Sequence, residues 1–139
     1  MKLYKYLNWR CYVNGVNIAP NGTPSAANAQ TEETPIAQNI MIRKPIDGSL
    51  SNREYPEIYH SFTPSGLGIT SGFGYWLLDL GEEYKVDSIV YYNRNGYVER
   101  AIGMLIETYD KNFNINSPGS SVALNTFTLN SDLIQTFNL

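Results

Sequence analysis

The sequence contains few of the residues that catalysis and metal binding most often use. It has one histidine, His60, and one cysteine, Cys11, so no His/Cys set has the spacing of a zinc site. The Gly-x-Ser-x-Gly motif of serine hydrolases is absent. The adjacent acidic pairs at 32–33 and 82–83 fall in predicted loops, where carboxylates are more often solvated than catalytic. We therefore expect a protein that is not an enzyme.

Charge and long apolar runs are also scarce. Charged residues form 17% of the chain, and the formal net charge of -3 gives no sign of the positively charged surface that binds nucleic acid. No apolar run approaches the length that crosses a membrane. The first nine residues lack the apolar core and cleavage site of a secretion signal, and a single cysteine cannot form an internal disulfide. We expect a protein that neither binds nucleic acid nor spans a membrane, and that is not secreted through a signal peptide.

What is present favours β-structure. The chain has 7 prolines, 11 glycines and 11 tyrosines, and its apolar residues often alternate with polar ones. Residues 75–80 alternate in this way, whereas residues 86–92 are nearly all apolar, which predicts a strand that is covered on both faces. The predicted core residues are Trp76, Leu78, Leu80, Ile89 and Tyr91.

Further strands are expected at residues 3–13, 16–19, 39–42, 101–109, 122–129 and 133–139. Asn14-Gly15 is a hairpin signal, after which residues 16–19 would either pair back or run on. Cys11 should be a small buried hydrophobe rather than a reactive thiol. Residues 20–38 have no periodicity and are predicted to form a long surface loop. Short strands with turns at regular spacing indicate an all-β fold, a single β-sandwich domain over residues 1–139.

Several short motifs occur in a recognisable order. A tryptophan-containing strand ends at Asp79-Leu80-Gly81, a buried strand ends at Tyr92-Asn93-Arg94, and Glu99-Arg100 follows. This order resembles the discoidin or coagulation-factor type C family of galactose-binding-like domains. The branch it is most similar to is the fucose-binding lectins and their relatives in large DNA viruses and phages. The resemblance implies a jelly-roll β-sandwich.

The same resemblance implies a carbohydrate site. In the family a histidine and two arginines hold sugar hydroxyls, which here implies His60, Arg94 and Arg100, with Tyr97 or Phe62 packing on the sugar's apolar face. The family's loop has an aspartate that orients the first arginine, and Gly96 stands in its place. An alternative is that Arg94 pairs with Glu99 or caps loop carbonyls, and that His60 is an ordinary exposed residue.

Calcium is the structural ion that the resemblance implies, held near a turn that matches Pro45-Ile46-Asp47-Gly48. Arg43 and Lys44 directly precede this turn, and no glutamate follows Asp110 in the place of the family's late acidic ligand. Calcium needs six or more oxygen ligands, so we expect no bound metal and no cofactor.

Two functions follow from these observations. The first is a structural or interaction module, such as a minor capsid protein or another virion component assembled in the cytoplasm. Its contacts with other subunits are expected at the apolar residues Phe62, Leu67 and Phe73 of a Gly-rich loop and along the charge-free strand at 133–139. The alternative is a lectin domain for fucose- or galactose-type glycans, for example on a cell surface.

Overall fold

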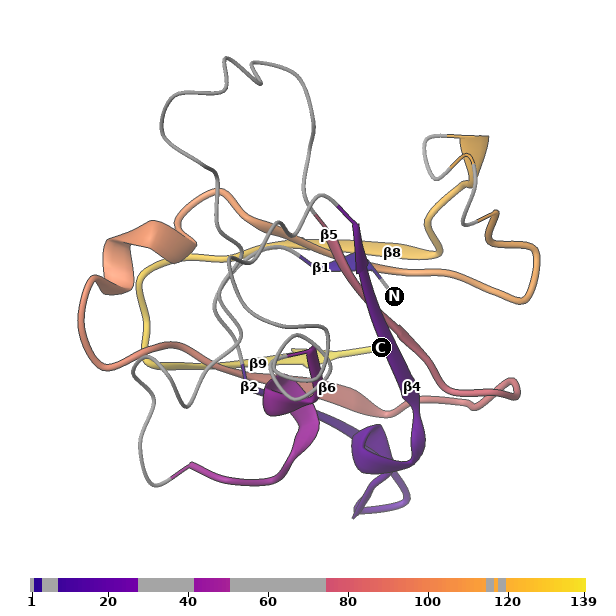
Figure 1. The fold of residues 1–139 in the computed structure, drawn as a ribbon, viewed down its shortest axis with the longest axis horizontal. Coiled ribbons are helices and arrows are strands. Elements are labelled where there is room, and N and C mark those ends of the chain that lie inside the picture. The colour runs from indigo at the N-terminus through magenta and orange to yellow at the C-terminus, as the bar shows by residue number, and fades with distance from the viewer. Residues whose placement is uncertain (1, 4–7, 28–41, 51–74, 115–116, 118–119) are drawn as a thin grey trace.

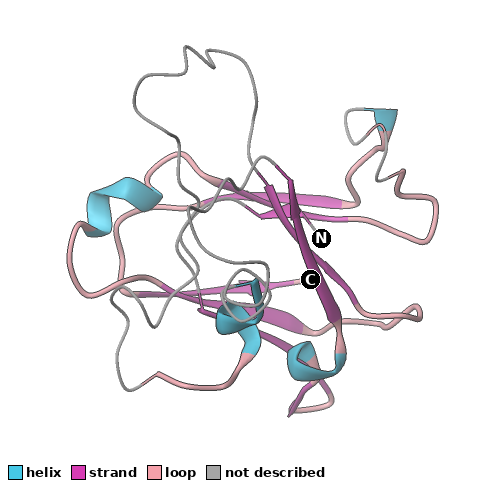
Figure 2. Ribbon diagram, in the orientation of Figure 1, coloured by secondary structure: helices cyan, strands magenta, loops and turns pink. Residues whose placement is uncertain are grey.

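The computed structural model describes residues 2–3, 8–27, 42–50, 75–114, 117 and 120–139 (Figure 1). Strands and their connecting loops make up most of these residues (Figure 2). Among them, only Ile42 and Arg43 have α-helical conformation. Three 3-10 helices lie wholly within the described residues: η1 (Ala19–Asn21), η2 (Lys44–Ile46) and η3 (Val98–Ala101). The strands form two open antiparallel sheets.

One sheet has four strands, with β6 in its interior. Its order is β3 (Val16–Asn17), β2 (Asn8–Val13), β6 (Ser88–Tyr92) and β9 (Ile134–Asn138). The turn between β2 and β3 has positive φ at Asn14 (49°) and Gly15 (77°), which is the backbone that a tight hairpin requires. The predicted hairpin is therefore confirmed.

The other sheet has five strands drawn from distant parts of the chain. Its order is β4 (Thr23–Ala27), β5 (Tyr75–Asp79), β1 (Lys2–Leu3), β7 (Leu105–Thr108) and β8 (Asn125–Thr128). The strand expected at residues 3–13 is thus split, because β1 belongs to this sheet and β2 to the four-stranded one.

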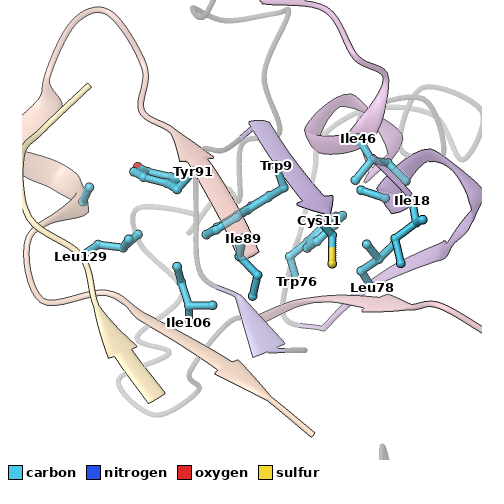
Figure 3. Packing of buried hydrophobic residues seen from close by; sticks show 12 residues of the cluster. Trp9, Cys11, Ile18, Ile46, Trp76, Leu78, Ile89, Tyr91, Ile106 and Leu129 are labelled. Atoms are coloured by element: carbon cyan, nitrogen blue, oxygen red, sulfur yellow. The ribbon is translucent and has the colours of Figure 1, made fainter. Parts of the chain in front are cut away.

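A single hydrophobic cluster lies between the two sheets, as Figure 3 shows for Trp9 and Ile89 on one side and Trp76 and Ile106 on the other. The rings of Trp9 and Tyr91 lie 4.9 Å apart, centroid to centroid. Burial of such large apolar side chains is the main favourable term in folding. The buried members of the cluster are Trp9, Cys11, Ile18, Ala19, Ile46, Trp76, Leu78, Ile89, Tyr91, Ala101, Ile106 and Leu129.

Four of the five predicted core residues are buried, and the fifth, Leu80, which directly follows β5, is only half-buried. The prediction that both faces of residues 86–92 are covered was wrong. In β6 only Ile89 and Tyr91 are buried, while Val90 and Tyr92 on the opposite face keep partial exposure. The strand is interior to its sheet, but one of its faces is half open.

The prediction of one long loop at residues 20–38 was also wrong, because β4 pairs with β5 along its whole length. A Cβ at Gly22 would stand 2.5 Å from Leu78 Cδ1, so only glycine lets the chain approach β5 here. Pro24 fits because β4 is an edge strand. Of the strand expected at residues 39–42, only Ile42 is described, and it stands in a helical turn.

Cys11 lies in β2 with its side chain in the core, 2% exposed. Burial raises the pKa of its thiol from 9.0 to about 11, because the thiolate would lose its hydration. The side chain is therefore a buried apolar group, as the alternation of β2 predicted.

This burial makes stability depend on pH in a defined window. Because the thiol's pKa is raised on folding, its contribution is complete below pH 9.0 and is lost as the pH rises toward about 11. Urea unfolding across this range should show the wild type losing roughly 2–3 kcal/mol more than the Cys11→Ala variant. Tyrosine titration is common to both proteins and cancels in the comparison. Equal losses would show that the thiol is not buried in the folded state.

Candidate functional site

The loop after β6 is held by one buried amide. Asn93 is 1% exposed, its Nδ2 donates to the carbonyl of Val98 at 3.0 Å, and its Oδ1 accepts from the main-chain N–H of Arg94 at 2.9 Å. Its own main-chain N–H donates to the carbonyl of Leu133 at 2.8 Å. This residue therefore joins the loop from β6 to η3 and the turn that precedes β9.

Three side chains of this loop converge, and we call them the Arg–Tyr cluster: Arg94, Tyr97 and Arg100. The Cζ atom of Arg94 lies 5.1 Å from the centroid of the Tyr97 ring, and that of Arg100 lies 4.6 Å from it. Arg94 is 7% exposed, whereas Tyr97 is 61% exposed. Two guanidinium groups therefore lie near one exposed phenol ring, within the distance at which cations and aromatic rings attract.

The backbone at Tyr97 is unusual for a residue with a side chain. Its φ of 56° and ψ of 42° are left-handed, and it is the N-cap of η3. This conformation costs about 1–2 kcal/mol in residues other than glycine, so neighbouring contacts must hold it. The Asn93–Val98 hydrogen bond and the bond from Arg100 N to Tyr97 O, 3.1 Å long, close the turn on both sides.

The structure thus brings together three of the predicted carbohydrate-binding residues, at the end of the molecule where η3 lies beside the β8–β9 turn (Figure 1). The fourth, His60, lies outside the described residues, and so do Phe62, Leu67 and Phe73 of the predicted subunit interface. That the cluster binds a carbohydrate stays a prediction.

The turn that resembles a calcium loop directs its carboxylate to protein partners. Asp47 Oδ1 accepts from the N–H of Ser49 at 2.8 Å, and Oδ2 lies 3.9 Å from Lys44 Nζ. Across the residues that the structure describes, no three His, Cys, Asp or Glu side chains group as metal ligands would.

A second surface is formed by the exposed side chains of residues 120–139, which we call the C-terminal rim. Between residues 112 and 139 the only charged residue is Asp132. Strands β8 and β9 are edges of different sheets, and the rings of Phe127 and Phe137 join them at 4.9 Å. The large apolar side chains that the rim exposes are Val122, Leu124, Leu133, Ile134 and Leu139.

The turn between β8 and β9 is fixed by Gln135, which is 8% exposed. Its Oε1 accepts from Asn130 N at 3.0 Å, and its Nε2 donates to Asn130 O at 3.1 Å. Sequence reasoning missed Asn93 and Gln135. For Asn93 a signal existed, since a polar amide directly after a buried strand is well placed to satisfy a loop's main chain.

Comparisons with known proteins identify no relative: no family model, curated protein or solved structure matches the chain. None of the helices in the described ranges has the length and apolar character needed to cross a membrane.

The role of Asn93 can be measured directly. The Asn93→Ala change removes the partners of the Val98 carbonyl and the Arg94 N–H, so we expect it to lower the free energy of unfolding by about 1–3 kcal/mol. Asn95→Ala is the matched control, because Asn95 is exposed in the same loop. Urea denaturation that shows equal effects for the two variants would contradict the assigned role.

Proposed function

We propose that the chain is a non-catalytic interaction module, held in a larger protein assembly by its C-terminal rim. One observation carries this proposal. Residues 112–139 contain a single charged residue, yet they supply five of the exposed large apolar side chains in the described part of the molecule. Charge is depleted and apolar side chains are enriched at the centre of protein interfaces. We therefore take the exposed apolar side chains of this charge-poor segment as its contact residues.

The fold that we propose for this module is the jelly-roll sandwich of the discoidin family. The order of motifs around β5 and β6 supports it, and so do two open antiparallel sheets around one core. The assembly that we propose is a virus particle put together in the cytoplasm, with the chain as a minor capsid protein or another virion component. This last step rests on the resemblance of the sequence to viral relatives alone.

A second candidate function is the binding of fucose- or galactose-type glycans, and the Arg–Tyr cluster favours it. Guanidinium groups donate hydrogen bonds in a fixed planar geometry, and sugar hydroxyls accept them. Arg94 is positioned by the buried Asn93, while Tyr97 and Arg100 are exposed and accessible to a ligand. By the family resemblance, His60 would be the third sugar-binding residue beside Arg94 and Arg100.

The assembly proposal predicts a difference between two apolar residues of equal exposure. Leu124 in the rim is 64% exposed, and Val16 in the β2–β3 hairpin is 63% exposed. Leu124→Ser, alone or with Leu133→Ser, should weaken association at least tenfold (about 1.4 kcal/mol), because it removes apolar contact area. Val16→Ser should leave association unchanged. Sedimentation velocity over a range of concentrations measures both, and similar behaviour of the two variants would argue against the rim.

The glycan proposal predicts that Arg100→Ala weakens the binding of fucose or galactose by about 10- to 100-fold, because the variant loses one charge-assisted hydrogen bond to the sugar. Its unfolding midpoint should not change, because Arg100 is exposed. Arg43→Ala, at an exposed arginine beside η2, is the control. Isothermal titration with the free sugars measures these affinities. Undetectable binding to the wild type, or equal losses in both variants, would reject the glycan site.

A further inference from the structure

Strand β9 is an edge of the four-stranded sheet. Its hydrogen bonds to β6 determine which of its main-chain N–H and C=O groups point away from the sheet. Asn93 N donates to Leu133 O at 2.8 Å, and Leu139 N donates to Asp87 O at 3.0 Å. Both bonds continue the register of the β6–β9 ladder. Hydrogen-bonded pairs alternate along an antiparallel ladder, so the odd-numbered residues of 133–139 bond to β6.

The even-numbered residues therefore direct their N–H and C=O groups away from β6. These residues are Ile134, Thr136 and Asn138, and all of them are exposed. In the described part of the chain no strand lies beyond β9. The edge thus presents three consecutive outward positions that another extended strand can pair with.

The other sheet edges offer less to a partner strand. Strand β3 is only two residues long, and β4 contains Pro24, which lacks an N–H donor. Short edge strands and edge prolines are devices by which proteins avoid pairing at their edges. Strand β9 has five residues and contains neither a proline nor a charge. It is also longer than β8, the remaining edge, which has four residues.

We propose that β9 pairs antiparallel with β9 of a second copy of this chain, about a two-fold axis at Thr136. This proposal rests on the proposed assembly function and names its partner. The register places Thr136 opposite the partner's Thr136 and Ile134 opposite the partner's Asn138. Every outward main-chain group of β9 then has a partner, and the two four-stranded sheets become one continuous sheet across the dimer.

The absence of charge favours a second copy over an unrelated partner. In a two-fold pair each side chain lies opposite itself or its symmetry mate, so a single charge near the axis would face its own copy and repel it. A different partner could neutralise such a charge with one of opposite sign. Strand β9 has none, and the threonine pair at the axis belongs to the cross-strand pairs that stabilise sheets.

Disulfide trapping tests the register. Hydrogen-bonded pairs in antiparallel strands have Cα atoms about 5.5 Å apart, which a disulfide can span. Under mild oxidation Thr136→Cys should give a covalent dimer on its own. Ile134→Cys and Asn138→Cys should each stay uncrosslinked alone and should crosslink when mixed. The native Cys11 does not interfere, because it is buried.

The control is Thr126→Cys, an exposed threonine on the edge of the other sheet. Dimer yield from Thr136→Cys no greater than from this control would overturn the proposal, as would efficient crosslinking of Ile134→Cys with itself. Thr136→Lys should in addition weaken dimerisation at least tenfold relative to Thr126→Lys. If crosslinking fails while Leu124→Ser still dissociates the assembly, only the pairing through β9 is wrong and the rim remains a contact surface.

Discussion

The position of β6 in the middle of its sheet is the constraint on which the rest of the structure depends. Its main chain bonds to β2 on one side and β9 on the other, and its inward residues Ile89 and Tyr91 fill the space against the second sheet. A shift of one residue would exchange its buried and exposed faces. The same register brings Asn93 to the end of the strand, where it holds the following loop. Core packing and the geometry of the candidate site therefore share one origin.

Charge is distributed unevenly along this scaffold. All charged residues but Asp132 lie before residue 112, and two of them, Arg94 and Arg100, belong to the Arg–Tyr cluster. The last two strands carry polar uncharged and apolar side chains instead. The low charge of this last segment is the reason that we propose the C-terminal rim as the surface in contact with protein. The two candidate surfaces differ in chemistry although they meet at one end of the molecule.

Local patterns predicted the parts of the fold that depend on local physics. Alternation identified the buried Trp76 and Leu78 of β5 but not Leu77, which is also buried. Asn14-Gly15 identified the first hairpin because its backbone angles suit few other pairs. Strand β4 was missed because it depends on a close approach at Gly22, which only the position of Leu78 reveals. The Arg–Tyr cluster came from family resemblance, not from periodicity. The roles of the buried amides depend on partners that composition does not indicate.

The hydrogen bond from Asn93 N to Leu133 O has a thermodynamic consequence. Arg94 follows the donor directly, and Ile134, the first residue of β9, follows the acceptor. A rearrangement of the η3 loop that displaces Asn93 N would therefore also remove the hydrogen-bond partner of Leu133, directly before the edge strand. If a ligand at the cluster changes the affinity of β9 for a neighbour through this bond, the neighbour must change the affinity for the ligand by the same factor.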